Sequence, residues 1–323
     1  MSVLYAALVR GRRWLYDTGA WPRTRMPVPV VVVGNVVAGG TGKTPVVMAL
    51  VEHLRAQGWR PGVVSRGHGR LTRGCLEVLA HMSARDCGDE PLLIRQRCRV
   101  PVFVASLRAQ AAENLLKTHP DINILVADDG LQHHALARDI NIAVFDDRGT
   151  GNGWLLPAGP LREPWQTDRV NLVLHTGQHP AFAGFQASRS LATHGQSAQG
   201  QSVPLHSLKH QRLMALAGIA QPEAFFDMLR QQGLTLEHTL ALPDHHDCQG
   251  LDLLNEPGLT LLCTEKDAVK LFALYPDAGL RLLAVPLVFS PEPAFLQALD
   301  ALLAPLKRQL PHHLPSAHGH PTS

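Results

Sequence analysis

A glycine-rich stretch that ends in Lys-Thr, NVVAGGTGKTPVV at residues 35–47, has the composition of a phosphate-binding loop. Glycines let successive backbone N–H groups face the phosphates of a nucleotide, and the start of the following helix adds a partial positive charge. Lys43 would reach the β- and γ-phosphates, and Thr44 would hold Mg²⁺. We predict that the phosphates lie against eight residues: Val37, Ala38, Gly39, Gly40, Thr41, Gly42, Lys43 and Thr44.

The loop departs from the strict P-loop pattern at one position. Val37 stands where that pattern has glycine, although Gly39 and Gly40 still supply the turn. The alternative interpretation is a glycine-rich strand–helix turn without a ligand. Ala38 stands where a group of dimerising P-loop ATPases carries a signature lysine, so the sequence argues against that group.

Two adjacent carboxylates follow a strand-like run further along the chain. Asp128 and Asp129 come directly after the apolar residues of NILVA. Carboxylates at the end of a strand beside a phosphate loop are suitable Mg²⁺ ligands. Paired aspartates can also simply begin a turn. The phosphate loop in the same chain favours the metal interpretation.

The elements that must position these residues alternate between strand and helix. β-Branched runs such as residues 26–37 predict buried parallel strands, and residues 44–59 have helical periodicity. This alternation predicts an α/β fold with a doubly wound, mostly parallel sheet of the P-loop NTPase type over residues 25–164. We expect a second, smaller α/β domain at 165–305, completing the active-site cleft, and a polar, irregular surface excursion at 177–201.

The two ends of the chain differ from the middle. Residues 1–24 combine apolar residues at near-helical spacing with arginines and tryptophans, and they contain no 18-residue apolar run or signal-peptide pattern. Such a helix could lie on an anionic membrane surface, or it could pack on the main domain with a solvated basic face. Residues 306–323 are rich in Pro, Ser, Gly and His, which predicts a disordered tail.

Bulk composition excludes some classes of protein. The 323 residues are 45% hydrophobic, enough for one large or two ordinary domains. A formal net charge of +3 without a dense Lys/Arg block argues against a nucleic-acid partner. Five scattered cysteines without a C-x-x-C pair fit a reduced, cytosolic protein better than a zinc site.

Two short polar motifs allow more than one interpretation. In GDEP, Asp89 and Glu90 precede an apolar run, which fits a helix N-cap as well as a catalytic loop. In PDHH, Asp244 and His245 belong to a cluster that could bind a metal, although two adjacent histidines do not easily point the same way. The residues alone leave both questions open.

Two further polar stretches follow apolar runs. In SRGHGR, Arg66 and Arg70 either close on phosphate or belong to a solvated basic loop. In TEKD, Lys266 and Asp267 follow a strand at the end where α/β sheets bind ligands, so they are candidates for nucleotide contacts. His133 and His134 are expected to be structural, or to support residues that bind the ligand, rather than to be ligands themselves.

Seven motifs in order resemble one family. They are GGTGKTP (39–45), SRGHGR (65–70), GDEP (88–91), DDGLQHH (128–134), GNGWLLPAGPLREP (151–164), PDHH (243–246) and TEKDAVK (264–270). Together they resemble the tetraacyldisaccharide 4′-kinases of lipid A biosynthesis, from the N-terminal helix to about residue 305. That family is a membrane-associated P-loop kinase, and it carries the same departure at the position of Val37.

The resemblance implies an activity and a site. It implies that ATP, with Mg²⁺, phosphorylates the 4′-hydroxyl of a lipid A disaccharide 1-phosphate, giving lipid IVA at the cytoplasmic face of a bacterial inner membrane. Asp89 would be the catalytic base and His245 its partner. The resemblance further assigns Glu90, Asp128 and Asp129 to Mg²⁺, and Arg162 and Glu163 to the transferring phosphate.

This activity also bears on the N-terminal helix and on the rival functions. An enzyme that must find an acylated acceptor needs a peripheral membrane contact, which favours the membrane-surface interpretation of residues 1–24. The rivals are a P-loop switch or chaperone ATPase, for which no partner-facing feature is evident, and a soluble kinase for a small metabolite. No obligate protein partner is evident from the sequence.

Overall fold

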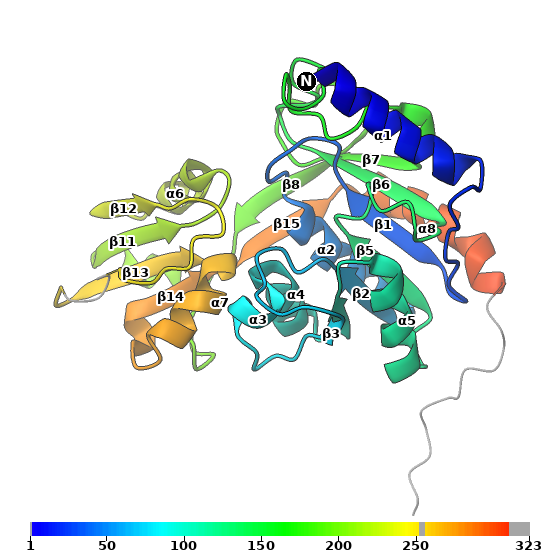
Figure 1. Cartoon of the computed structure of the whole chain (residues 1–323). Coiled ribbons are helices and arrows are strands. Elements are labelled where there is room, and N and C mark those ends of the chain that lie inside the picture. The colour runs from blue at the N-terminus through cyan, green and yellow to red at the C-terminus, as the bar shows by residue number, and fades with distance from the viewer. Residues whose placement is uncertain (1, 252–255, 310–323) are drawn as a thin grey trace, which may run out of the picture.

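The computed structural model describes residues 2–251 and 256–309, which form two lobes, each built on one sheet (Figure 1). The larger lobe holds a nine-stranded sheet of order β15-β8-β7-β6-β1-β5-β2-β4-β3. Its strands are β1 (Val30–Gly34), β2 (Pro61–Ser65), β3 (Leu76–Glu77), β4 (Val102–Val104), β5 (Ile124–Asp128), β6 (Ile140–Phe145), β7 (Leu172–His175), β8 (Phe185–Leu191) and β15 (Leu287–Pro291).

The order of these strands confirms the expected doubly wound α/β sheet. Strands β8 to β4 run parallel, while β3 and β15 are antiparallel at the two edges. The first strand, β1, lies in the interior, and the chain builds outwards from it on both sides. In the register of β1 and β5, Val33 pairs with Asp128, which brings the phosphate loop and the paired aspartates to the same edge.

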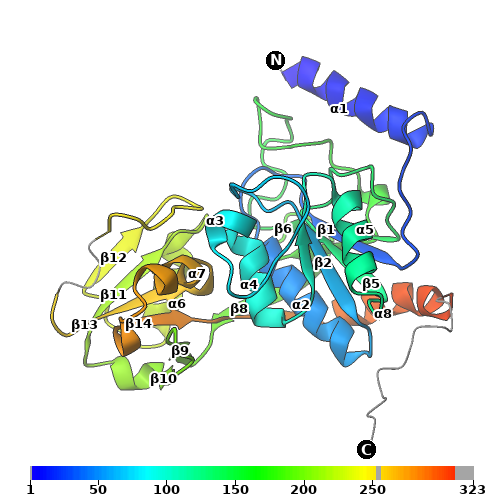
Figure 2. The ribbon, with the colours of Figure 1, turned by 60° about the horizontal axis from the view of Figure 1, so that its bottom comes forward.

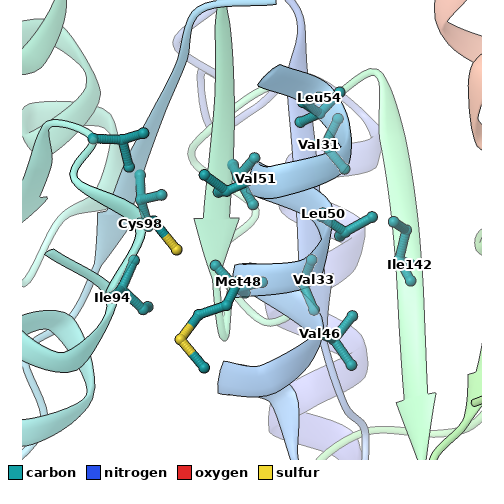
Figure 3. Close-up of a cluster of buried hydrophobic side chains, with 14 of the residues drawn as sticks. Val31, Val33, Val46, Met48, Leu50, Val51, Leu54, Ile94, Cys98 and Ile142 are labelled. Atoms are coloured by element: carbon teal, nitrogen blue, oxygen red, sulfur yellow. The ribbon is translucent and has the colours of Figure 1, made fainter. Parts of the chain in front are cut away.

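Helices cover both faces of this sheet because the residues of β1 alternate. Val31 and Val33 face a core formed with α2 (Lys43–Ala56), α4 (Asp89–Cys98) and α8 (Pro293–Arg308). Figure 3 shows part of this core, in which Val46, Leu50 and Leu54 of α2 lie against the strands. Val30 and Val32 face the opposite core, which includes α5 (Arg108–Thr118). Burial on both faces explains the continuous valine run.

The smaller lobe holds a six-stranded sheet of order β10-β9-β14-β13-β11-β12. Its strands are β9 (His194–Gln196), β10 (Ser202–Pro204), β11 (Arg212–Ala217), β12 (His238–Ala241), β13 (Leu259–Thr264) and β14 (Leu282–Val285). Helices α6 (Pro222–Gln231) and α7 (Glu265–Leu274) pack on this sheet, and α7 also contacts α4 of the larger lobe (Figure 2).

The chain passes between the two sheets through an antiparallel ribbon of β8 and β15, with Leu191 opposite Leu287. The sheets therefore do not divide at residue 165, because β7 and β8 continue the larger one. The prediction of an irregular excursion at 177–201 is wrong over β8, because β8 is a regular strand whose alternate residues are exposed. The last helix, α8, runs to Arg308 and packs on the larger lobe, so residues 306–308 are helical. The rest of the expected tail, 310–323, lies outside the described residues.

The N-terminal helix α1 (Ser2–Asp17) lies across the top of the larger lobe in Figure 1 and has no buried residue. Polar contacts attach it: Tyr5 Oη donates to the carbonyl oxygen of Arg162 (2.8 Å), and Arg12 donates to that of Gln132 (3.1 Å). Leu8 and Trp14 are 65% and 63% exposed. Within residues 2–251 and 256–309, no helix is both long and apolar enough to cross a bilayer.

Candidate active site

The phosphate loop joins β1 to α2, and its own side chains and backbone fix its shape. Gly39 and Gly42 have φ angles of 94° and 76°, in the left-handed region that favours glycine. The buried Asn35 side chain donates to the carbonyl oxygen of Val37 (2.6 Å). The helix α2 then begins at Lys43, so its free N–H groups point into the loop.

A segment far along the chain completes the outer side of this loop. The N–H of Ala38 donates to the carbonyl oxygen of Pro160 (2.7 Å), and the N–H of Arg162 donates to that of Val36 (2.7 Å). Because these are backbone contacts, they do not depend on side-chain rotamers. The GNGWLLPAGPLREP motif therefore supports the loop and brings Arg162 beside it.

Arg189 reaches the loop from β8. It lies against Gly42, where a Cβ would collide with its guanidinium, and its Nη2 lies 3.5 Å from the carbonyl oxygen of Thr41. Its Nε is buried without a hydrogen-bond partner, and no ion pair holds the group within the described part of the chain. Arg148, by contrast, is paired with Asp146 (2.7 Å). The loop thus has one neighbouring guanidinium that lacks an anion.

The paired aspartates face the loop from the end of β5. Asp129 has a φ of 47°, which is uncommon for a non-glycine residue. Its carboxylate lies 3.4 Å from Lys43 Nζ and 3.1 Å from Arg162 Nη1. Lys43 also donates to Asn35 Oδ1 (3.2 Å). Two cations therefore converge on Asp129 beside the loop.

Asp128 is the buried member of the pair and suits a cation. Its Oδ2 accepts a hydrogen bond from Ser65 (3.1 Å), but its buried Oδ1 has no partner. Burial first, and then the charges of Glu90 and Asp129, raise the pKa of the Asp128 carboxyl well above its usual range. An orphaned carboxylate oxygen among like charges, with Thr44 at the helix start, fits the oxygen-donor set that Mg²⁺ prefers.

The three carboxylates are not gathered tightly enough to form a complete metal cage. Glu90 is drawn towards Lys266 (3.4 Å), and Asp129 towards Lys43. Among the described residues, one group of potential ligand atoms lies within 4.8 Å of one another, and it is exposed and distant in the fold: Glu237, His238 and Glu256. Arg212 pairs with both glutamates of that group.

Asp89 and His245 meet across the two lobes. Asp89 begins α4, and the N-cap position before it is Gly88, with a φ of 94°. His245 follows β12 of the smaller lobe and has a φ of 64°. Its Nδ1 lies 3.0 Å and 3.1 Å from the two carboxylate oxygens of Asp89. Positive φ in a histidine indicates a backbone that its surroundings must hold in place.

Two lysines of α7 complete the electrostatics of this pair. Lys266 Nζ lies 3.9 Å and Lys270 Nζ 3.5 Å from Asp89 Oδ2. Burial alone would raise the pKa of Asp89, but the hydrogen bond from His245 and the lysine charges outweigh it and hold that pKa well below its usual range. The hydrogen bond to Asp89, opposed by burial, raises the pKa of His245. Asp89 is therefore a carboxylate at neutral pH.

The loop and the smaller lobe enclose a cavity of about 200 Å³. Residues 40–45, Arg189 and Glu90 line one side, and Asp244 and Lys266 line the other. Apolar side chains of the smaller lobe complete the wall, among them Ile219, Ala224, Phe225 and Met228. The geometry combines a phosphate loop, a carboxylate edge and an apolar wall in one cleft.

Comparison with known proteins agrees with this geometry. The family model described as tetraacyldisaccharide-1-P 4′-kinase matches residues 1–304. A tetraacyldisaccharide 4′-kinase of Polaromonas naphthalenivorans (strain CJ2) is 60% identical, covering 100% of this chain and 94% of the relative. One of Acidovorax sp. (strain JS42) is 56% identical, covering 95% of this chain and 90% of the relative.

A solved structure is similar over nearly the whole chain. The crystal structure of an "apo" form of LpxK from Aquifex aeolicus in complex with ATP gives a TM-score of 0.81 at 30% sequence identity, covering 94% of this chain and 96% of that one. This chain belongs to the tetraacyldisaccharide-1-phosphate 4′-kinase family. The P-loop fold expected from the sequence is confirmed, and the family is one of ATP-dependent kinases.

For this kinase, the structure brings most of the predicted site residues together. Residues 40–44 line the cleft with Glu90, and Asp129 lies beside Lys43 and Arg162. The N-cap alternative for Asp89 is wrong, because Gly88 holds that position. Glu163, however, lies apart from its neighbour Arg162: its buried carboxylate accepts from Gln132 (2.7 Å) and lies 3.9 Å from His134.

Of three other predicted residues, two have structural contacts and the third is exposed. Asp267 is fully buried and accepts hydrogen bonds from Gly218 N–H (2.9 Å) and Thr264 Oγ1 (2.7 Å), so it cannot face a nucleotide. Arg70 donates to the carbonyl oxygen of Gly74 (2.5 Å). Arg66 is exposed on the same loop.

Sequence reasoning missed several residues of this kinase site. Asn35 lies inside the glycine-rich stretch 35–47, but its residue type alone predicts no role. Arg189 lay in the stretch expected to be irregular, and Arg148 had no motif to mark it. Lys270 closed the TEKDAVK motif, where its spacing of four from Lys266 places both on one face of a helix. That spacing was the one signal available.

Proposed function

We propose that this protein transfers the γ-phosphate of ATP to the 4′-hydroxyl of a tetraacyldisaccharide 1-phosphate, forming lipid IVA. We place it peripherally at the cytoplasmic face of a bacterial inner membrane. The observation that carries the proposal is the contact of Asp89 with His245 (3.0 Å), a pair that Lys266 joins to the wall of the cleft that holds the phosphate loop. Family membership supports the choice of acceptor.

The phosphate end of the cleft supplies positioning and positive charge. Backbone N–H groups of the loop and Lys43 hold the polyphosphate, and Arg162 sits beside Asp129 where charge develops on the transferred group. Thr44, Glu90, Asp128 and Asp129 would hold Mg²⁺. When bound, this ion neutralises phosphate charge. We propose no direct role for Glu163 in transfer, because its contacts are with Gln132 and His134.

The Asp89–His245 pair supplies the base. Asp89 is a carboxylate at neutral pH, so it can accept the proton of the acceptor hydroxyl while the hydroxyl oxygen attacks phosphorus. His245 orients the carboxylate through Nδ1, and Lys266 and Lys270 keep it charged. Because a loose transition state needs little base strength, an aspartate with a lowered pKa is sufficient.

The membrane part of the proposal rests on α1. Val3, Leu4, Leu8 and Trp14 are exposed on this helix, which also carries Arg10. Apolar side chains with flanking arginines favour an anionic bilayer surface. Removing residues 1–24 should raise KM for a lipid-presented acceptor more than it lowers ATP hydrolysis. An equal loss of both would indicate a folding defect instead.

A radiolabel assay tests the activity. Wild type, Asp89→Ala and Asp86→Ala receive [γ-³²P]ATP with a lipid A disaccharide 1-phosphate. Asp86 is the matched control, because it is a nearby aspartate of α3 (Ala84–Cys87) that lines neither the cleft nor the cavity beside Asp89 and His245. We expect labelled bisphosphorylated lipid from wild type and Asp86→Ala, and turnover lowered by about 10²-fold or more in Asp89→Ala with ATP binding retained.

Two outcomes would contradict the proposal. Wild type that labels no lipid would reject the acceptor. Asp89→Ala with wild-type turnover would reject the base while leaving the acceptor intact.

A further inference from the structure

A second cavity, of about 300 Å³, lies under the C-terminal half of α1 and shares no lining residue with the nucleotide cleft. Its lining is rich in arginine, with four guanidinium groups against two carboxylates. The arginines are Arg13, Arg23, Arg138 and Arg169, and the acids are Asp17 and Glu163.

The two carboxylates are already engaged. Asp17 accepts from Arg23 (2.7 Å) and from Arg169 (2.9 Å). Glu163 accepts from Gln132 (2.7 Å), a neutral donor. The remaining two arginines of the cavity therefore have no carboxylate in ion-pair contact within the described residues.

Those two arginines differ in how they are held. Arg138 donates to the carbonyl oxygen of Leu131 (2.8 Å) and to His134 Nδ1 (2.6 Å), which fixes its guanidinium at the wall. Arg13 has a buried Nε without a hydrogen-bond partner. A buried N–H without a partner is costly, and a guanidinium that no carboxylate contacts directly can still donate to an added anion. The cavity is therefore prepared for an anion that can accept several hydrogen bonds.

The arginines lower the pKa of titratable neighbours, although Glu163 and Asp17 oppose this effect at Arg13. Burial first, and then the charges of Arg138, Arg12 and Arg13, lower the pKa of His134 to about 3. Burial and then Arg169 lower the pKa of Arg13. His134 is thus neutral in this wall and leaves the anion to the arginines.

We propose that this cavity binds a phosphate group, free or on a lipid headgroup, and that the bound phosphate holds α1 on the larger lobe. Phosphate matches the site because its oxygens accept hydrogen bonds from several guanidinium groups at once. The lipid source is accessible because α1 also exposes Leu8 and Trp14 to a bilayer. The proposal is independent of the acceptor named above, since the cavity lies outside the nucleotide cleft.

The experiment compares Arg13→Gln with Arg10→Gln. Arg10 is exposed on the same helix and does not line the cavity, so both variants remove one positive charge from α1. Thermal unfolding with inorganic phosphate, against sodium chloride of equal ionic strength, tests the free source. Flotation with phosphatidylcholine vesicles, with and without phosphatidic acid, tests the lipid source. Each variant must first melt in one cooperative transition.

We expect wild type and Arg10→Gln to respond alike to at least one of the two phosphate sources. Arg13→Gln should bind that source about tenfold more weakly, the scale of a lost charge-assisted hydrogen bond. A response to inorganic phosphate that Arg13→Gln weakens identifies free phosphate, and a response only to phosphatidic acid that Arg13→Gln weakens identifies a headgroup; either supports the site. An unchanged response in Arg13→Gln, as phosphate bound at the nucleotide loop would give, would overturn it, as would equal losses in the two variants or no phosphate response in wild type.

Discussion

The two sides of the nucleotide cleft are built by different means. On the larger lobe, backbone hydrogen bonds hold the phosphate loop, as between Ala38 and Pro160 (2.7 Å). On the smaller lobe, charged side chains reach across the cleft to the larger lobe, as Lys266 does to Glu90 (3.4 Å). The phosphate grip is therefore set within one lobe. The Asp89–His245 pair exists only while both lobes are in contact.

The largest loss of activity should come from the larger-lobe side of the cleft, which we call the preset side because backbone hydrogen bonds hold its phosphate loop. Lys43→Ala removes the cation that faces Asp129 and that we propose holds the polyphosphate, so turnover should fall by about 10²- to 10³-fold. Lys117→Ala, on the exposed face of α5, is the control and should keep wild-type turnover. Steady-state kinetics with saturating acceptor measures both. Wild-type turnover in Lys43→Ala would remove the loop from the reaction.

The next largest effect, that of His245→Gln, separates the Asp89–His245 pair from the phosphate loop. His245→Gln should lower turnover by about tenfold and leave ATP affinity unchanged, because His245 orients Asp89 and does not line the nucleotide cavity. His246→Gln is the neighbouring control. If the two residues act as a unit, adding His245→Gln to Asp89→Ala should cost little more than Asp89→Ala alone. Fully additive losses would contradict the pair.

The preset side was also the more predictable from sequence. Glycines, Lys43 and an apolar run before Asp128 are local signals, and each maps to one turn or strand. The contact of Asp89 with His245 joins residues 156 positions apart, so no spacing rule could give it. The family resemblance implied it instead.

The ribbon between the lobes was missed for a physical reason. β8 alternates exposed and partly buried residues, and its sequence FQASRSL is too polar to predict a strand of the main sheet. It pairs with β7 only over its first residues, and most of its pairing comes from β15, about a hundred residues later, with Arg189 opposite Phe289. A strand stabilised by a partner far along the chain leaves little local pattern.

Arg189 links that ribbon to the preset side, which gives a third prediction. Its guanidinium lies at the loop without an anion, so it should contact the nucleotide phosphates. Arg189→Ala should raise KM for ATP by about fivefold to tenfold with a smaller change in kcat, and Arg189→Lys should recover part of the loss. Arg230→Ala, on α6 with an exposed ion pair, is the control. An unchanged KM would show that Arg189 only packs against Gly42.

The smallest effect concerns the pH dependence of the contact between the lobes. The pKa of His245 is raised by Asp89, so its charge adds stability that is fully present below the unfolded value near 6.5 and is lost as pH rises through the folded value. Asp89, with its lowered pKa, stays charged throughout this window. The stability advantage of wild type over His245→Gln should therefore be greater at about pH 5.5 than at about pH 9.

The size of that advantage tests how much the histidine holds the lobes together. It should not exceed about 1 kcal/mol, because His245 is partly exposed and Lys266 and Lys270 still face Asp89 when the imidazole is neutral. Urea unfolding at the two pH values, followed by tryptophan fluorescence, measures the difference. An advantage that grows with pH would mean that the neutral imidazole makes the contact, and the charged pair would then be the wrong description of the site.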